Sequence, residues 1–233
     1  MIVRSGTAVS FPILFAEGRP DAGVSYTVYD PAGVVLATGT VAVPGDAVSI
    51  YLQVDGATNL LATNALLSYR DIEWSYAVGG RIMTGEARYT VEARLPYGVS
   101  ADGVRAKLGV DKTDLPDSDI SLARAYLNFQ GIVGVDRLAA HDPADITVTD
   151  AIEAQAALVL IPTMAVRVAT KESSGTNQFQ RQAIDWDAVA TALEGMVSAG
   201  YSAVDPAYDE TEAFGSLLIV VTPATDAITG VTG

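Results

Sequence analysis

Residues 150–170 read DAIEAQAALVLIPTMAVRVAT, and residues 156–166 within them are apolar apart from Pro162 and Thr163. A segment this apolar, with no polar stripe, is typical of a helix that is buried on all sides. We therefore expect this helix to be the hub of a helical region over residues 99–204. The apolar run is shorter than the roughly 20 residues that cross a bilayer, so we expect no transmembrane helix.

The ends of this stretch carry helix signals. Asp150 is a candidate N-cap, and Arg167 and Lys171 lie near the other end, where cations interact favourably with the helix dipole. Pro162 lacks a backbone donor and clashes with the preceding turn, which predicts a kink or a split in the helix.

Composition narrows the possible functions. The chain has 233 residues, 49% of them hydrophobic, which fits one large or two small folded domains. It has no cysteine and one histidine, His141, in an Ala-Ala-His-Asp-Pro segment that predicts a surface loop. Disulfides, thiol nucleophiles and zinc sites are thereby excluded, and a Ser-His-Asp triad has little support. With no phosphate-binding glycine motif either, we expect no enzyme and no cofactor.

The formal charge of −14 is concentrated in the second part of the chain. Residues 1–98 hold 6 basic and 9 acidic side chains, whereas residues 99–233 hold 8 and 19. No basic residue follows Arg181. This balance disfavours binding to nucleic-acid phosphates and favours either simple solubility or a basic partner surface.

Residues 1–98 have the alternation and turn residues of β-strands. Turns at residues 30–33 and at Gly79-Gly80 predict two hairpins, and Pro12 predicts that its strand lies at a sheet edge. Several short strands at this spacing predict an antiparallel β-sandwich of immunoglobulin-like architecture, with Trp74 in its core. The expected strands cover residues 7–15, 25–29, 34–37, 41–43, 48–54, 69–78 and 81–92.

From residue 99 the apolar period becomes helical, after a short linker at residues 95–98. Ser100 and Gly109 are expected to bound a helix over residues 101–108. Asp117 or Ser118 should cap a second helix that runs to about Gln130. Residues 135–148 then read as a loop with a turn of helix.

The last helix is expected between Asp185, as its N-cap, and Gly200, after a polar loop at residues 171–182. Its apolar stripe, which includes Trp186 and Leu193, should face the core. Beyond it come an acidic loop, an apolar strand-like run at residues 217–221 and a tail. We therefore expect an α+β chain with a β-sandwich domain (1–98), a helical domain (99–204) and a C-terminal arm (205–233).

Four aspartates gather between the first two helices, at Asp111, Asp114, Asp117 and Asp119. Calcium binding is one reading, because hard cations require several oxygen ligands. The EF-hand spacing, glycine and distal glutamate are absent. The other reading is that one or two of these carboxylates cap the next helix and the rest are solvated.

The stretch SADGVRAKLGVDKTDLPDSDISLARAYL, residues 100–127, resembles the head–tail connector (adaptor) proteins of long-tailed bacteriophages. In that family a short helix that ends in Leu-Gly is followed by a Leu-Pro-Asp cap and a second helix. Here these are Leu108-Gly109 and Leu115-Pro116-Asp117. A long apolar helix, a polar loop and a further helix follow, so the resemblance covers residues 99–204.

The resemblance implies a structural virion protein at the head–tail interface, made in the host cytoplasm. It would form a ring of identical copies, expected to be a dodecamer, below the portal protein. The ring would extend the DNA channel without sequence-specific DNA binding and seat the next neck or tail-terminator protein, with no membrane involved. An N-terminal β domain departs from the family pattern.

Partner binding is expected in the polar loop and in the apolar segment of the C-terminal arm. The candidate residues are Lys171, Asn177, Phe179, Arg181, Phe214, Leu217, Leu218 and Val220. The alternative function is a virion-surface or extracellular binding module whose β-sandwich recognises carbohydrate or protein.

Overall fold

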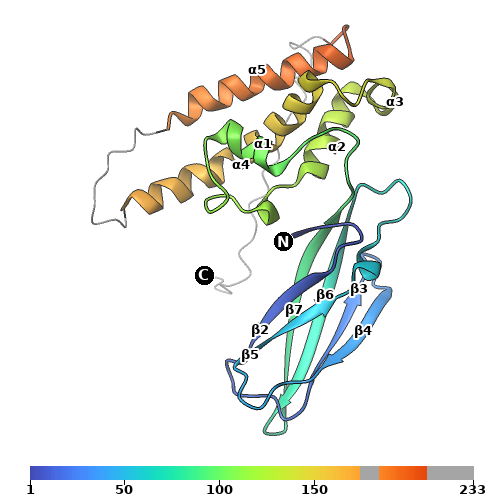
Figure 1. Cartoon of the computed structure of the whole chain (residues 1–233), viewed down its shortest axis with the longest axis vertical. Coiled ribbons are helices and arrows are strands. Elements are labelled where there is room, and N and C mark those ends of the chain that lie inside the picture. The colour runs from blue at the N-terminus through green and yellow to red at the C-terminus, as the bar shows by residue number, and fades with distance from the viewer. Residues whose placement is uncertain (174–183, 209–233) are drawn as a thin grey trace, which may run out of the picture.

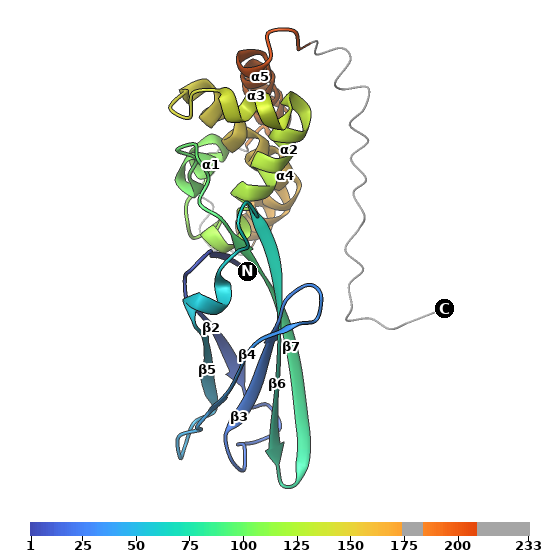
Figure 2. The same ribbon diagram turned by 90° about the vertical axis from the view of Figure 1, so that its right-hand side faces the viewer.

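A computed structural model describes residues 1–173 and 184–208, without the side chains of residues 168–173. In these residues the chain is a mixed α+β protein with a five-stranded sheet, a two-stranded sheet and five α-helices. The strands precede the helices in sequence and occupy the opposite end of an elongated molecule (Figures 1 and 2). The expected α+β class, strands first and helices second, is therefore confirmed.

The larger sheet has the strand order β1-β7-β6-β3-β4, and the smaller sheet pairs β2 with β5. All pairs are antiparallel except β1 with β7. Strand β1 has no counterpart among the predicted strands, and of the strand predicted at residues 41–43 only Val41 is in a strand. The strands are β1 (Ile2–Arg4), β2 (Val9–Leu14), β3 (Val24–Tyr29), β4 (Val35–Val41), β5 (Ser49–Val54), β6 (Leu67–Val78) and β7 (Arg81–Glu92).

Both predicted hairpins form. In the β6–β7 turn, Gly79 and Gly80 have φ values of 55° and 80°. Two successive positive φ angles suit the right-handed twist of the flanking strands, and glycine adopts them without steric strain. Pro12 lies on β2, which pairs only with β5 among the described residues. The strand is thus at a sheet edge, as predicted, where proline can lack a backbone N–H donor.

Side chains from both sheets form one hydrophobic cluster, in which Leu52, Ile72 and Tyr89 are fully buried. Trp74, predicted as a core residue, is only partly buried at the margin of this cluster. Gly85 lies opposite it in the register of β6 and β7, and a Cβ atom there would overlap the indole ring. The tryptophan therefore covers a gap in the sheet surface.

The helices form a second hydrophobic cluster. Ser100 and Gly109 bound the first helix as predicted: the Ser100 side chain accepts the N–H of Gly103, and Gly109 is left-handed with φ 67°. The second helix begins later than predicted, because Ser121 rather than Asp117 or Ser118 is its N-cap. The helices are α1 (Ala101–Leu108), α2 (Leu122–Val133), α3 (Val135–Ala140), α4 (Ile146–Ser173) and α5 (Trp186–Val204).

Helix α4 differs from the prediction at both ends and along one side. It begins at Ile146, so Asp150 is not its N-cap, and it continues past Pro162 to Ser173 without a split. Ala151, Ile152 and neighbouring residues of its first half are buried, but Val159 and Val166 are 62% and 68% exposed. The expectation of burial on all sides is therefore wrong for the second half of the helix.

By length and composition, Ile146–Arg167 of α4 could cross a membrane. This differs from the expectation of no transmembrane helix, which rests on the shorter apolar run at residues 156–166. A core helix of a soluble protein meets the same criterion, and α4 packs against α1, α2 and α5.

Helix α5 returns along α4 (Figure 1). Asp185 is its N-cap, as predicted, and accepts the N–H of Ala188 at 3.0 Å. The helix does not end at Gly200 but continues to Val204. A Cβ atom on Gly200 would overlap Ala151, so this glycine allows the close approach of α4 and α5 rather than a helix end.

Candidate functional site

Most of the residues predicted to bind partners lie outside the described part of the chain. These are Asn177, Phe179, Arg181, Phe214, Leu217, Leu218 and Val220. The backbone of Lys171 lies in the last turn of α4, so the predicted polar loop does not begin at residue 171; the Lys171 side chain is outside the described set.

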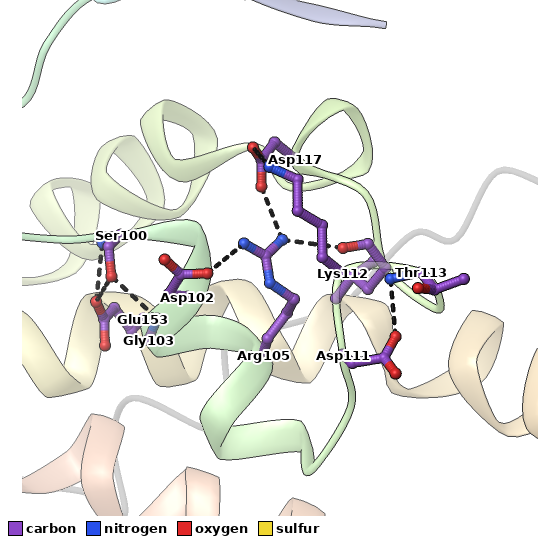
Figure 3. Close-up of polar contacts among 10 residues, drawn as sticks. Ser100, Asp102, Gly103, Arg105, Asp111, Lys112, Thr113, Asp117 and Glu153 are labelled. Carbon is purple, nitrogen blue, oxygen red and sulfur yellow. Dashed lines mark hydrogen bonds and ion pairs between the residues drawn. The ribbon is translucent and has the colours of Figure 1, made fainter.

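One aspartate of the predicted cluster, Asp117, binds a buried guanidinium. Arg105, on α1, is 5% exposed. It donates to the Leu115 carbonyl at 3.0 Å, to Asp117 at 2.8 Å and to Asp102 at 2.6 Å, as Figure 3 shows. A buried charge requires such pairing, because an unpaired one would be expensively desolvated. Arg105 thus fastens the loop after α1 to that helix.

The other aspartates of this cluster also have structural partners. Asp111 accepts the N–H groups of Thr113 and Asp114, an Asx turn, and Asp119 pairs with Arg167 at 2.8 Å. Hydrogen bonds from Lys112, and then from Arg105, hold the pKa of Asp117 below its usual value.

In the described ranges no group of three acidic, histidine or cysteine side chains could hold a metal ion. The aspartates pair with cations and backbone groups and do not cap α2. The expected capping of α2 is therefore wrong, whereas the expected solvent exposure holds for Asp111, Asp117 and Asp119.

A second polar network links α1 to α4. Glu153, 5% exposed, accepts from the backbone N–H of Ser100 at 2.8 Å and from Lys107 at 2.8 Å (Figure 3 shows its contact with Ser100). Lys107 also donates to Asp150 at 2.8 Å. Burial favours neutral Lys107, but the hydrogen bonds that it donates to the two carboxylates outweigh this effect and raise the pKa of the ammonium group. Lys107 therefore stays charged and connects α1 to α4.

The strands and helices are joined through Glu92, a fully buried carboxylate at the end of β7. It accepts hydrogen bonds from the Ser121 hydroxyl and from the N–H of Ala123 at 3.4 Å, both at the start of α2. A carboxylate is favourable there because the first N–H groups of a helix have no partner within the helix. On the neighbouring strand, the Tyr69 hydroxyl accepts from Arg124 of α2 at 3.0 Å.

His141 is half-buried beside the first turn of α4. Its Nε2 lies 2.8 Å from a carboxylate oxygen of Asp145, and that hydrogen bond lowers the pKa of Asp145. The other Asp145 oxygen accepts the N–H of Thr147. The pair therefore secures the start of α4.

The outer face of the larger sheet contains a shallow hollow of about 810 Å³, lined by residues that include Tyr29, Asp71, Glu73, Glu86 and Arg88. Asp71 and Arg88 pair through two hydrogen bonds of 2.6 and 2.9 Å. Glu73 and Glu86 lie directly opposite each other on β6 and β7, an arrangement that like charges make unfavourable.

Comparison with known proteins does not identify the chain. No protein-family model matches it, and no curated protein is significantly similar to it in sequence. Sequence reasoning missed the buried residues Glu92, Arg105 and Glu153 as structural hubs, since their roles depend on contacts between distant segments.

Proposed function

We propose that this protein is a head-to-tail adaptor of a tailed bacteriophage, forming a ring below the portal. The supporting observation is that residues 100–127, which resemble phage connectors in sequence, form two helices joined by a loop, as the resemblance implies. The stretch that resembles phage connectors folds as α1, an anchored loop and α2, and the long hairpin of α4 and α5 follows. The order of these helices is the one that the resemblance implies, although Ser121 and not Asp117 caps α2 and the short helix α3 is additional.

We propose a division into an immunoglobulin-like β-sandwich and a helical bundle, which would place two functional modules in one subunit. The separate hydrophobic clusters of strands and helices support this division. The two-stranded and five-stranded sheets share the first cluster, as the layers of a sandwich do. The helical bundle would form the ring, and the β-sandwich would face a neighbouring virion component.

Assembly would use surfaces of the helical hairpin and the segments that follow its two helices. The side chains of Val159 and Val166 are 62% and 68% exposed, so α4 presents apolar surface to solvent in the described structure. The expected contacts to the portal and to neighbouring subunits are residues 171–182 and 205–233. The net charge of −14 would keep channel DNA from adhering, because like charges repel.

A binding module is the second candidate function, favoured by the hollow on the outer sheet face. Its acidic lining and the opposed Glu73 and Glu86 favour a cationic surface of another protein. The hollow holds one aromatic lining residue, Tyr29, so it has little of the stacking surface that carbohydrate binding uses.

The deciding experiment is mass photometry with negative-stain imaging of the full-length protein, alone and mixed with a phage portal. Rings, or binding that depends on the portal, are expected. A protein truncated after residue 204 should keep its circular dichroism spectrum and lose portal binding. If the full-length protein stays monomeric and binds none of a panel of portals, the adaptor proposal is refuted and the binding module becomes the favoured function.

A further inference from the structure

A hollow of about 430 Å³ lies where the strands meet the helices. Its lining contains two arginines, Arg4 and Arg94, together with uncharged residues of the turn that leads to α1. No carboxylate belongs to this lining. We call it the arginine hollow.

The walls of the arginine hollow are held in place by contacts on both sides. The N–H of Ser5 donates to the Glu92 carbonyl at 2.7 Å, which fixes the segment after β1. On the other wall Leu95 and Tyr97 are 7% and 4% exposed, and the Tyr97 hydroxyl donates to the Leu138 carbonyl at 3.0 Å. Both arginines therefore project from a backbone that is organised before any ligand arrives.

The two guanidinium groups retain most of their donor capacity. Arg4 uses Nη1 for one long hydrogen bond of 3.4 Å to the Ala93 carbonyl, and its nearest carboxylate, Glu92, is 3.8 Å away. Arg94 is exposed and makes no hydrogen bond or ion pair with the described residues. A guanidinium carries five N–H donors, so several remain available here.

Half of the twelve basic side chains that the structure describes are neutralised by close carboxylates, and Arg4 and Arg94 belong to the other half. Six of the described basic side chains pair with carboxylates at 2.6–2.8 Å, namely Arg88, Arg105, Lys107, Lys112, Arg137 and Arg167. The short helix Asp117–Asp119 lies beside β1, but Asp117 pairs with Arg105 and Lys112, and Asp119 pairs with Arg167. Although the protein has a net charge of −14, no close carboxylate among the described residues neutralises the two arginines of the hollow.

We propose that the arginine hollow is an oxyanion-binding site and that its ligand is a phosphate group. A tetrahedral phosphate can offer separate oxygen atoms to two guanidinium groups at once, whereas a single carboxylate suits one guanidinium fork. The phosphate is either a free anion or part of a nucleic-acid backbone. This inference is independent of the adaptor proposal.

The test is isothermal titration calorimetry of the full-length protein with inorganic phosphate at constant ionic strength. Saturable binding is expected, and Arg94→Gln should weaken it roughly tenfold, since one charge-assisted hydrogen bond contributes about that factor. Arg4→Gln should act in the same direction. The matched control is Arg81→Gln, because Arg81 is also exposed without a described partner but follows the β6–β7 turn, at the far end of the strands (Figure 1).

Proton–nitrogen NMR of the arginine side chains gives a second readout that does not depend on a variant. Phosphate should shift the Nε signals of Arg4 and Arg94 and leave that of Arg81 unchanged. A short DNA duplex that binds more tightly than phosphate, and loses affinity in Arg94→Gln, would identify the nucleic-acid backbone as the source. Absence of saturable binding, or equal weakening by Arg81→Gln, would overturn the proposal.

Discussion

Replacing Glu92 by glutamine tests whether one buried carboxylate couples the strands to the helices. Glu92 is fully buried and accepts from Ser121 and from the Ala123 N–H. Its ion pair with half-exposed Arg4 is long, at 3.8 Å, so we expect it to contribute less than the two hydrogen bonds. The loss should therefore come from the two hydrogen bonds and from the helix terminus.

The magnitude follows from these contacts. Hydrogen bonds to a charged group contribute about 1.5–3 kcal/mol each, and an anion at a helix N-terminus about 0.3–2 kcal/mol. Glutamine keeps one acceptor oxygen, so only part of this sum is lost. We expect the free energy of unfolding to fall by roughly 2–3 kcal/mol, which lowers the melting temperature by roughly 5–10 °C for a chain of this size.

The assay is urea unfolding, read separately in the two parts of the molecule. Trp74 lies on β6 and Trp186 begins α5, and these are the two tryptophans of the chain. Removing either one, as Trp74→Phe or Trp186→Phe, leaves a fluorescence signal from the other part. In each background Glu92→Gln should lower stability, and the two transitions should separate.

The control is Glu86→Gln, on the same strand but exposed, which should change stability by less than about 0.5 kcal/mol. If Glu92→Gln matches this control, the contact with α2 contributes nothing and the reasoning is refuted.

Two further outcomes are expected. Gly200→Ala should lower the free energy of unfolding by about 1–2 kcal/mol, because overlap with Ala151 outweighs the helix propensity gained. Gly195→Ala, on the same helix but with open space around it, should raise the free energy of unfolding by up to about 1 kcal/mol. Melting temperatures that shift in the same direction for both variants would contradict this. Burial raises the pKa of Tyr89, Tyr97 and Tyr201 to about 12. The unfolded chain releases these protons near pH 10, so stability should fall as the pH rises from about 10 to 12. Ultraviolet titration should show these tyrosines ionising only with unfolding, and a stability that is flat over this range would exclude their burial.

The sequence by itself determined the local structure wherever neighbouring residues supply the physics. Ser100 and Asp185 cap their helices because a short side chain accepts from an N–H three residues ahead. Gly79-Gly80 closes a hairpin because both residues take positive φ. Periodicity likewise separated strands from helices along the chain.

Only the tertiary structure decided the features that join distant segments. Gly200 resembles a helix end in the sequence, yet its missing side chain makes room for Ala151 of another helix. Glu92 resembles a solvent-facing strand residue, yet the start of α2 buries it. Arg4 and Arg94 are 90 residues apart and meet in one hollow. Alternation and capping patterns extend over a few residues, so they carry no information about which remote segment will cover a side chain.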